Sequence, residues 1–469
     1  MTIWPLKFRP NKAGGLNFAD DAGGFFRSDD RFLERYAGDN LSEADSAFLH
    51  RHGHAFDEID DLSYTGFAYR WAARQSYPRP TSYVILVPTL RCNLACNYCQ
   101  VSRADERALG YDWTEETVQA VLRFLGGLNC SDIKVEFQGG EPLLRVDLLE
   151  RVRSFARERF SKAEFVVCTN LQNLGPAEWA FLEAEDTFIS TSIDGDRVTH
   201  QRQRTKTTEK TEQFFGNLQA AVDRFGSHRI SALPTIDPDR PPDLDAIVET
   251  FTEYGIHSIY LRPVNHQGFA RKRFASNSST DRWNAIYGAF IDLLIERNAT
   301  GNTPVEEYYF VHCLRRVLKA GLDKHVDLRN PNFLGRDYLV VDFDGRFYPT
   351  DEARMLTRIG QIDLSIGNVF DGLERDKLSL LNENATNAFD PDCIHCPYQA
   401  FCGVDLIDDI SRSARVDRPK HETDFCRRHM FIFDKVFDLI YSDEPKARKS
   451  LALWTGVSEF PSELRPVHQ

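Results

Sequence analysis

The 469-residue sequence has no long apolar run and no excess of positive charge. No stretch approaches the roughly 18–20 apolar residues that a membrane-spanning helix needs. The net charge of −13 makes a nucleic-acid backbone a poor partner. The first residues, Met1 to Pro5, lack the basic start and apolar stretch of a signal peptide. We therefore expect a cytoplasmic protein that binds neither membrane nor nucleic acid.

Ten cysteines in a cytoplasmic chain indicate metal ligands rather than disulfides. Cys92, Cys96 and Cys99 have the spacing Cys-x3-Cys-x2-Cys and follow a strand-like run at 83–87. Three thiolates this close can hold three irons of a four-iron, four-sulfur cluster and leave the fourth iron open to a small-molecule ligand. A zinc knuckle or three free thiols is the alternative. Zinc is disfavoured because a structural zinc site needs four ligands, and no fourth Cys or His follows nearby.

Strands and helices alternate from residue 82 to about 268, which predicts an α/β fold with a parallel sheet. Six such units would make a partial (β/α)6 barrel, with its active site at the C-terminal ends of the strands. Strands are expected at 83–87, 134–137, 164–168, 187–192, 230–234 and 258–261. An Asp-Gly hairpin is expected at 337–348. The expected units are an N-terminal α+β segment (1–80), the barrel (81–270), a helical linker region (271–330) and a cysteine-bearing domain (331–469).

The cysteine motif resembles that of the radical S-adenosylmethionine (SAM) enzymes. About forty residues later comes a Gly-Gly-Glu-Pro segment, which in those enzymes recognises the methionine end of SAM; alone it could be a glycine turn. Ser192 and Arg204 resemble a pair that contacts the SAM ribose and carboxylate in SPASM-bearing peptide maturases. A guanidinium suits a carboxylate, although Arg204 could also be a solvated charge. The residues that this resemblance assigns to SAM are Tyr98, Gln138, Gly139, Gly140, Glu141, Pro142, Thr169, Asn170, Ser192 and Arg204.

The C-terminal cysteines Cys393, Cys396, Cys402 and Cys426 offer four soft ligands, which fit either zinc or an iron–sulfur cluster. They resemble the outer cluster site of the SPASM extension, so the resemblance implies one auxiliary [4Fe–4S] cluster. The pattern departs at the inner cluster, where Thr350 and Leu406 stand in place of expected cysteines. We expect the scattered Cys130, Cys168 and Cys313 to be packing residues.

Asp351, directly after Thr350, resembles an Asp that lies near the substrate in related maturases. As a catalytic residue it would accept a proton or position the peptide. The alternative is a turn residue that caps the segment after it.

Three segments, at 99–103, 348–355 and 396–405, resemble the His-Xaa-Ser system radical SAM maturases (HxsB-like). This resemblance implies an enzyme that reductively cleaves SAM to a 5′-deoxyadenosyl radical and modifies a ribosomally made precursor peptide, with side-chain crosslinking a frequent result. A flavodoxin- or ferredoxin-type reductant is implied as a partner. The N-terminal segment would be a peptide-binding cap or a plain structural extension. The alternatives are a sulfatase-type maturase that oxidises one Ser or Cys, and a non-catalytic partner that binds a precursor peptide.

Overall fold

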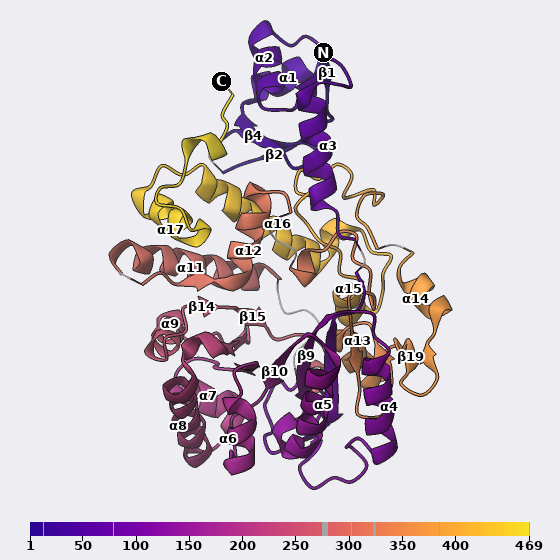
Figure 1. Ribbon diagram of the computed structural model, residues 1–469. Helices are drawn as coiled ribbons and strands as arrows, with labels where there is room; N and C mark the ends of the chain where they lie inside the picture. The colour runs from indigo at the N-terminus through magenta and orange to yellow at the C-terminus, as the bar shows by residue number, and fades with distance from the viewer. Residues whose placement is uncertain are drawn as a thin grey trace.

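A seven-stranded sheet organises the lower half of the molecule (Figure 1). The computed structural model describes residues 1–12, 14–77, 79–273, 280–301, 303–321, 325–383 and 385–468. The strand order is β12-β11-β10-β9-β6-β17-β18, and every neighbouring pair except β17 with β18 is parallel. The bounds are β6 Tyr83–Thr89, β9 Asp132–Gly139, β10 Lys162–Cys168, β11 Thr187–Thr191, β12 Ile230–Ala232, β17 Tyr338–Val341 and β18 Phe347–Tyr348. The parallel α/β fold is therefore confirmed, and the carboxyl ends of six strands lie on the same edge.

Amphipathic helices cover the outer face of this sheet. They are α4 (Glu115–Gly126), α5 (Val146–Arg159), α6 (Pro176–Glu183) and α8 (Thr208–Phe225). The Thr114 side chain accepts the Thr117 N–H and begins α4, whose Val118, Val121 and Leu125 are buried. In β9, Val135 and Phe137 are fully buried in the same core, so their neighbours Glu136 and Gln138 point to the opposite, inner face. The alternation of side chains along β9 thus gives the sheet an apolar outer face and a polar inner face.

The fifth and sixth barrel strands are each interrupted. The fifth continues past β12 as β13 (Thr235–Ile236), and the sixth consists of β14 (Ser258–Ile259) and β15 (Arg262–Pro263). Only β13 and β15 pair with each other, whereas β14 pairs with β16 (Glu306–Glu307). The barrel therefore opens at this side, where later parts of the chain pack.

The expected hairpin is present as β17 and β18, which turn at Asp344-Gly345 with Gly345 at φ 83°. β17 also pairs in parallel with β6, a position that the sequence pattern did not indicate. The helix α13 (Asp351–Arg358) follows directly. This pairing brings the start of the C-terminal extension to the mouth of the barrel.

Helices join the barrel to the rest of the chain. α11 (Thr280–Thr300) and α12 (Tyr308–Leu318) lie between the sheet and α16 (Asp424–Ile440) and α17 (Pro445–Thr455) (Figure 1). The predicted stripe on α11 is buried at Trp283, Tyr287, Phe290 and Leu294. Parts of the predicted linker region, residues 274–279, 302 and 322–324, lie outside the described residues. None of the helices within the described ranges is long and apolar enough to cross a membrane.

The N-terminal segment has its own small core. A three-stranded sheet, β2 (Lys7–Pro10), β3 (Leu16–Ala19) and β4 (Phe25–Ser28), packs with α1 (Asp30–Ala37) and α2 (Glu43–Arg51). The C-terminal tail contacts this segment: the Arg27 N–H of β4 donates a hydrogen bond to the Pro466 carbonyl at 3.0 Å.

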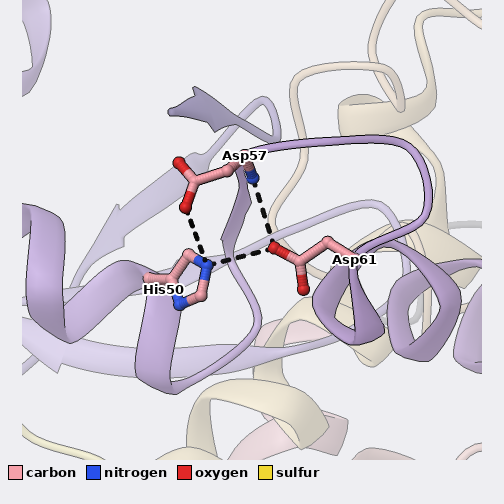
Figure 2. A group of neighbouring side chains, drawn as sticks. All are labelled: His50, Asp57 and Asp61. Atoms are coloured by element: carbon pink, nitrogen blue, oxygen red, sulfur yellow. Dashed lines mark hydrogen bonds and ion pairs between the residues drawn. The ribbon is translucent and has the colours of Figure 1, made fainter.

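A third N-terminal helix, α3 (Leu62–Arg74), was not predicted. Figure 2 shows how it is tied to α2: Asp61, which caps α3 by accepting the Ser63 N–H, also lies 3.1 Å from His50 Nε2. Asp57 completes this group at 3.4 Å from the same nitrogen. Helix capping and ion pairing account for all three side chains.

Candidate functional site

The loop of three cysteines lies at the carboxyl end of β6 and lines a cavity of about 440 Å³. Two contacts hold the loop in place. Arg91 binds Asp112 through two hydrogen bonds of 2.8 and 2.7 Å, and the Asn97 N–H donates to the Gln203 carbonyl at 2.9 Å. Burial and the nearby Glu141 carboxylate raise the pKa of the Cys92 thiol to about 12. Binding a metal here would therefore release protons from these thiols.

The sulfurs of this loop do not form the tight group that a single zinc ion needs. A tetrahedral zinc with bonds of about 2.3 Å needs sulfurs about 3.8 Å apart. Among the described residues, no three cysteine sulfurs lie within 4.8 Å of one another, either in this loop or near the C-terminus. Cys92, Cys96 and Cys99 nevertheless face one cavity, as three ligands of a [4Fe–4S] cluster would.

Gly139 and Gly140 are required by the cysteine loop itself. A Cβ on Gly140 would lie 2.2 Å from the Arg91 carbonyl oxygen and 2.4 Å from that of Leu90, and one on Gly139 would lie 2.1 Å from the Thr89 carbonyl oxygen. Both glycines also line the cavity. In this structure the two glycines therefore allow a close approach to the backbone of residues 89–91, whereas the sequence predicted a close approach to a ligand.

Glu141 and Pro142 were expected to contact SAM, but both are buried and neither lines the cavity. The Glu141 carboxylate accepts the backbone N–H groups of Asn170 at 2.8 Å and Leu143 at 3.2 Å. Burial raises its pKa to about 7 despite these bonds. Glu141 thus connects the glycine segment to the end of β10, and a contact of Glu141 or Pro142 with SAM stays a prediction.

Arg204 and Tyr98 form one network with a residue that the sequence analysis did not single out. The Arg204 guanidinium donates to the Tyr98 hydroxyl at 2.9 Å, and that hydroxyl lies 2.6 and 2.8 Å from the two Asp194 oxygens. Arg204 is 4.0 Å from Asp194 as well. Burial raises the pKa of Asp194, while the nearby Arg204 opposes that rise. The network places a half-buried cation at the wall of the cavity that the cysteines line.

The remaining expected SAM contacts gather at the same mouth. Gln138 ends β9, Thr169 and Asn170 follow β10, and Ser192 follows β11; all four line the cavity. The Asn170 amide donates to Asn93 Oδ1 at 2.8 Å and lies 3.7 Å from Cys92 Sγ. Parallel strands that end together bring these distant residues to one place.

Asp351 also lines the cavity, from the first turn of α13. Its Oδ1 accepts two hydrogen bonds from the buried Arg354, at 2.9 and 2.6 Å. Thr350, which stands where a cluster ligand was expected, accepts the Ala353 N–H and begins the helix. Asp351 is therefore both fixed by a cation and accessible to the cavity.

Three inward-facing polar side chains were missed by the sequence analysis. Glu136, Cys168 and Ser190 come from β9, β10 and β11 and line the cavity floor. The Cys168 thiol donates to Glu136 Oε1 at 3.2 Å, and the Tyr83 hydroxyl donates to Oε2 at 2.5 Å. The expectation that Cys168 is a mere packing residue is corrected. The available signal was the alternation along β9, which sets Glu136 on the face opposite Val135 and Phe137.

A second cavity of about 590 Å³ contains Cys393, Cys396, Cys402 and Cys426 together. Burial raises the pKa of each of these thiols, to about 11 for Cys426, and the neighbouring cysteines add to the rise at Cys393, Cys402 and Cys426. Strand β2 of the N-terminal segment forms one wall through Phe8, Arg9 and Pro10.

Arg9 is held in that wall by two hydrogen bonds of 2.8 Å to Asp434 of α16. Four thiols around one space fit a four-ligand cluster, and as in the first loop, no three of their sulfurs are close enough for zinc.

Residues 86–259 match the Radical SAM superfamily, so this part of the chain is a radical SAM domain; the cofactors of that family are a [4Fe–4S] cluster and SAM. An uncharacterized protein of Methanocaldococcus jannaschii is 28% identical over 115 residues, which are 24% of this chain and 38% of that protein. GTP 3′,8-cyclase of Erythrobacter litoralis is 30% identical over 129 residues, which are 27% of this chain and 38% of that enzyme. The chain thus spans well under half the length of these two curated relatives.

A similar fold is found in a solved structure of anSMEcpe with bound AdoMet and Kp18Cys peptide. The TM-score is 0.58 at 17% identity, and the match covers 80% of this chain and 99% of that chain. The likeness extends beyond the radical SAM domain into the C-terminal extension.

Proposed function

We propose that this radical SAM enzyme modifies a ribosomally made precursor peptide. The observation that carries the proposal is a single cavity with two kinds of wall. The cysteine loop and strand ends of the barrel form one wall, and Asp351 and Glu352 of the extension form the other. A site for SAM alone would not need the extension. The anSMEcpe structure, which holds both AdoMet and the Kp18Cys peptide, supports the idea that a peptide occupies the remaining space.

In this proposal each residue has a defined task. Cys92, Cys96 and Cys99 hold the catalytic cluster, which when loaded supplies one electron for the reductive cleavage of SAM. Arg204 faces the SAM carboxylate from its network with Tyr98 and Asp194. The expected SAM contacts Gln138, Gly139, Gly140, Thr169, Asn170 and Ser192 line the pocket. Glu141 and Pro142 support these residues from behind.

Asp351 is proposed to act at the peptide. A carboxylate that lines the same cavity as the cysteines could accept a proton from a substrate radical or orient the peptide. The two hydrogen bonds from Arg354 fix its orientation. Asp351 would be catalytic in the first role and a positioning residue in the second.

We further propose that Cys393, Cys396, Cys402 and Cys426 hold one auxiliary [4Fe–4S] cluster, which would take the surplus electron of the substrate radical. The division would then be a cap at 1–80, the barrel at 81–270, a helical linker at 271–330 and a SPASM-like domain at 331–469. The cap would bind the precursor peptide. A flavodoxin- or ferredoxin-type protein of the cytoplasm would supply electrons.

The segments at 99–103, 348–355 and 396–405 support membership of the HxsB-like maturases, and side-chain crosslinking is the proposed outcome. Anaerobic reconstitution tests this. The protein should bind about eight irons per chain, and with a strong reductant it should convert SAM to 5′-deoxyadenosine. Cys96→Ala should abolish the cleavage.

The matched control is Cys130→Ala, which alters a half-buried thiol outside both cavities. A precursor peptide encoded beside the gene should lose two hydrogen atoms per crosslink by mass spectrometry. A protein that binds iron and SAM but yields no 5′-deoxyadenosine would contradict the enzyme and support a binding partner. About one zinc with about four irons would reassign the C-terminal cysteines.

A further inference from the structure

A third cavity, of about 210 Å³, adjoins the SAM-side cavity between the open edge of the barrel and the C-terminal extension. The two cavities lie next to each other, because they share lining residues that include Gln100, Ser192, Tyr260, Arg262, Asp327 and Glu352. We call the new space the side pocket. Neither the cysteines nor the expected SAM contacts other than Ser192 line it.

Three carboxylates enter the side pocket from three different elements. Asp327 lies in the 3-10 turn η4 (Val326–Leu328) and Glu352 lies in α13. Asp405 is the N-cap of α15 (Leu406–Ser413). One oxygen of Asp405, Oδ1, accepts hydrogen bonds from the N–H groups of both Ile407 and Asp408, at 3.0 and 2.9 Å. The side pocket therefore concentrates negative charge where extension and barrel meet.

The cations around this pocket do not balance these three carboxylates. Arg412 and Arg428 both bind Asp408, at 3.2 and 2.9 Å, so they are engaged with a fourth acid. Arg262 remains, and its nearest carboxylate contact is 4.0 Å to Glu352. Burial makes His429 neutral by lowering its pKa to about 4. Within the part of the chain that the structure describes, three acids thus face one loosely placed guanidinium.

The acids also affect one another. Burial raises the pKa of Asp405, and the nearby Asp408, Asp327 and Glu352 carboxylates add to that rise. Burial and the neighbouring Asp351 raise the pKa of Glu352. Both shifts would be relieved by a positive charge between them.

A buried amide supplies an independent sign of a missing ligand. Gln267 also lines the side pocket and is only 3% exposed, yet its Oε1 receives no hydrogen bond from any described residue. A buried unpaired acceptor costs stability until a donor reaches it. Carboxylates and this carbonyl together call for a ligand rich in N–H donors.

We infer that the side pocket binds a cationic side chain of the substrate peptide, an ammonium, guanidinium or protonated imidazole, and thereby positions the neighbouring residue at the SAM site. This inference rests on the proposed peptide substrate. A bare metal ion does not fit, since Asp327, Glu352 and Asp405 are not among the described groups whose ligand atoms lie within 4.8 Å of one another. The hydroxyl of Tyr260, which donates to Asp327 at 3.1 Å, gives the wall a polar aromatic surface beside the cation.

Binding of small probes to the full-length, cluster-loaded protein with SAM tests the inference. N-acetyl-lysine amide, N-acetyl-arginine amide and N-acetyl-histidine amide at pH 6 are the cationic probes, and N-acetyl-norleucine amide is the neutral isostere of the first. Saturation-transfer NMR should show at least one cation binding about tenfold tighter than norleucine. The strongest of the three identifies the side chain.

Glu352→Gln and Asp405→Asn should each weaken that probe about fivefold, whereas Glu459→Gln, an exposed carboxylate far along the C-terminal tail, should leave it unchanged. Equal binding of norleucine and every cation would overturn the inference, as would tighter binding of N-acetyl-glutamate amide at Arg262. SAM cleavage without peptide is measured on the same samples. Its loss with intact probe binding would count against the proposed function alone, and the reverse result against the side pocket alone.

Discussion

Gly140→Ala should displace the cysteine loop, because the added methyl group has no room. Its Cβ would lie 2.2 Å from the Arg91 carbonyl oxygen and 2.4 Å from that of Leu90, roughly 1 Å closer than non-bonded contacts allow. Both obstacles are backbone atoms, so no side-chain rotation relieves the clash. The Gly140 N–H donates to the Thr89 carbonyl at 3.1 Å, and the Glu141 N–H donates to that of Arg91 at 2.8 Å. Moving the loop therefore also breaks hydrogen bonds.

Overpacking of this kind costs about 1–3 kcal/mol of unfolding free energy. The loss falls on the segment that presents Cys92, so we expect iron content to drop by about four per chain and SAM cleavage to fall with it. Urea unfolding of the metal-free protein measures the first effect, and iron analysis after anaerobic reconstitution measures the second. The matched control is Gly216→Ala on α8, where a Cβ would meet no atom within 4 Å. This exposed helical position should gain up to about 1 kcal/mol. A Gly140→Ala protein with full iron and full activity would refute the account of the loop.

Three other predictions concern the proton acceptor, the second cluster and a buried acid. Asp351→Asn should keep SAM cleavage near the starting rate but slow peptide modification about 100-fold, as followed by mass spectrometry; an equal loss of both would place Asp351 at SAM instead. Cys402→Ala should lower the iron content from about eight to about four per chain while Cys92, Cys96 and Cys99 stay loaded; an unchanged content would rule out a cluster at the C-terminal cysteines. Burial raises the pKa of Glu307 to about 7 from 4.5, so the folded state binds the proton more tightly and unfolding free energy should fall as pH rises from about 5 to 7. Glu307→Gln should remove up to about 3 kcal/mol of that fall in urea titrations, and an identical slope in both proteins would contradict it.

The elements that the sequence indicated correctly are those with a strong local pattern. The apolar run at 83–87 and the alternation around Val135 and Phe137 became β6 and β9, and Thr114 began α4 as expected. The sequence grouped the cysteines correctly into two sets, and each set lines one cavity; their role as cluster ligands stays a prediction. Residues that follow parallel strands, such as Thr169 and Ser192, were also placed at one mouth by the topology alone.

The failures have a common cause in long-range contacts. The sixth strand is split because β14 pairs with residues 306–307, which no local pattern can indicate. Glu141 sits in a specific segment, yet its side chain turns back to two backbone N–H groups. Asp194 contacts Tyr98 and Arg204, and Glu352 contacts Arg262; these partners lie about ten to a hundred positions away in the sequence. Local periodicity carries no information about such partners.

The pairing of β17 with β6 has a consequence for how the polypeptide is made. Roughly 250 residues separate these two neighbouring strands. During synthesis, one edge of β6 therefore stays unpaired until the ribosome has released the chain past Val341. At about 5–20 residues per second, that delay is on the order of ten seconds or more. A protein truncated before Tyr338 would keep this edge of β6 unpaired, and unpaired strand edges promote aggregation with other chains.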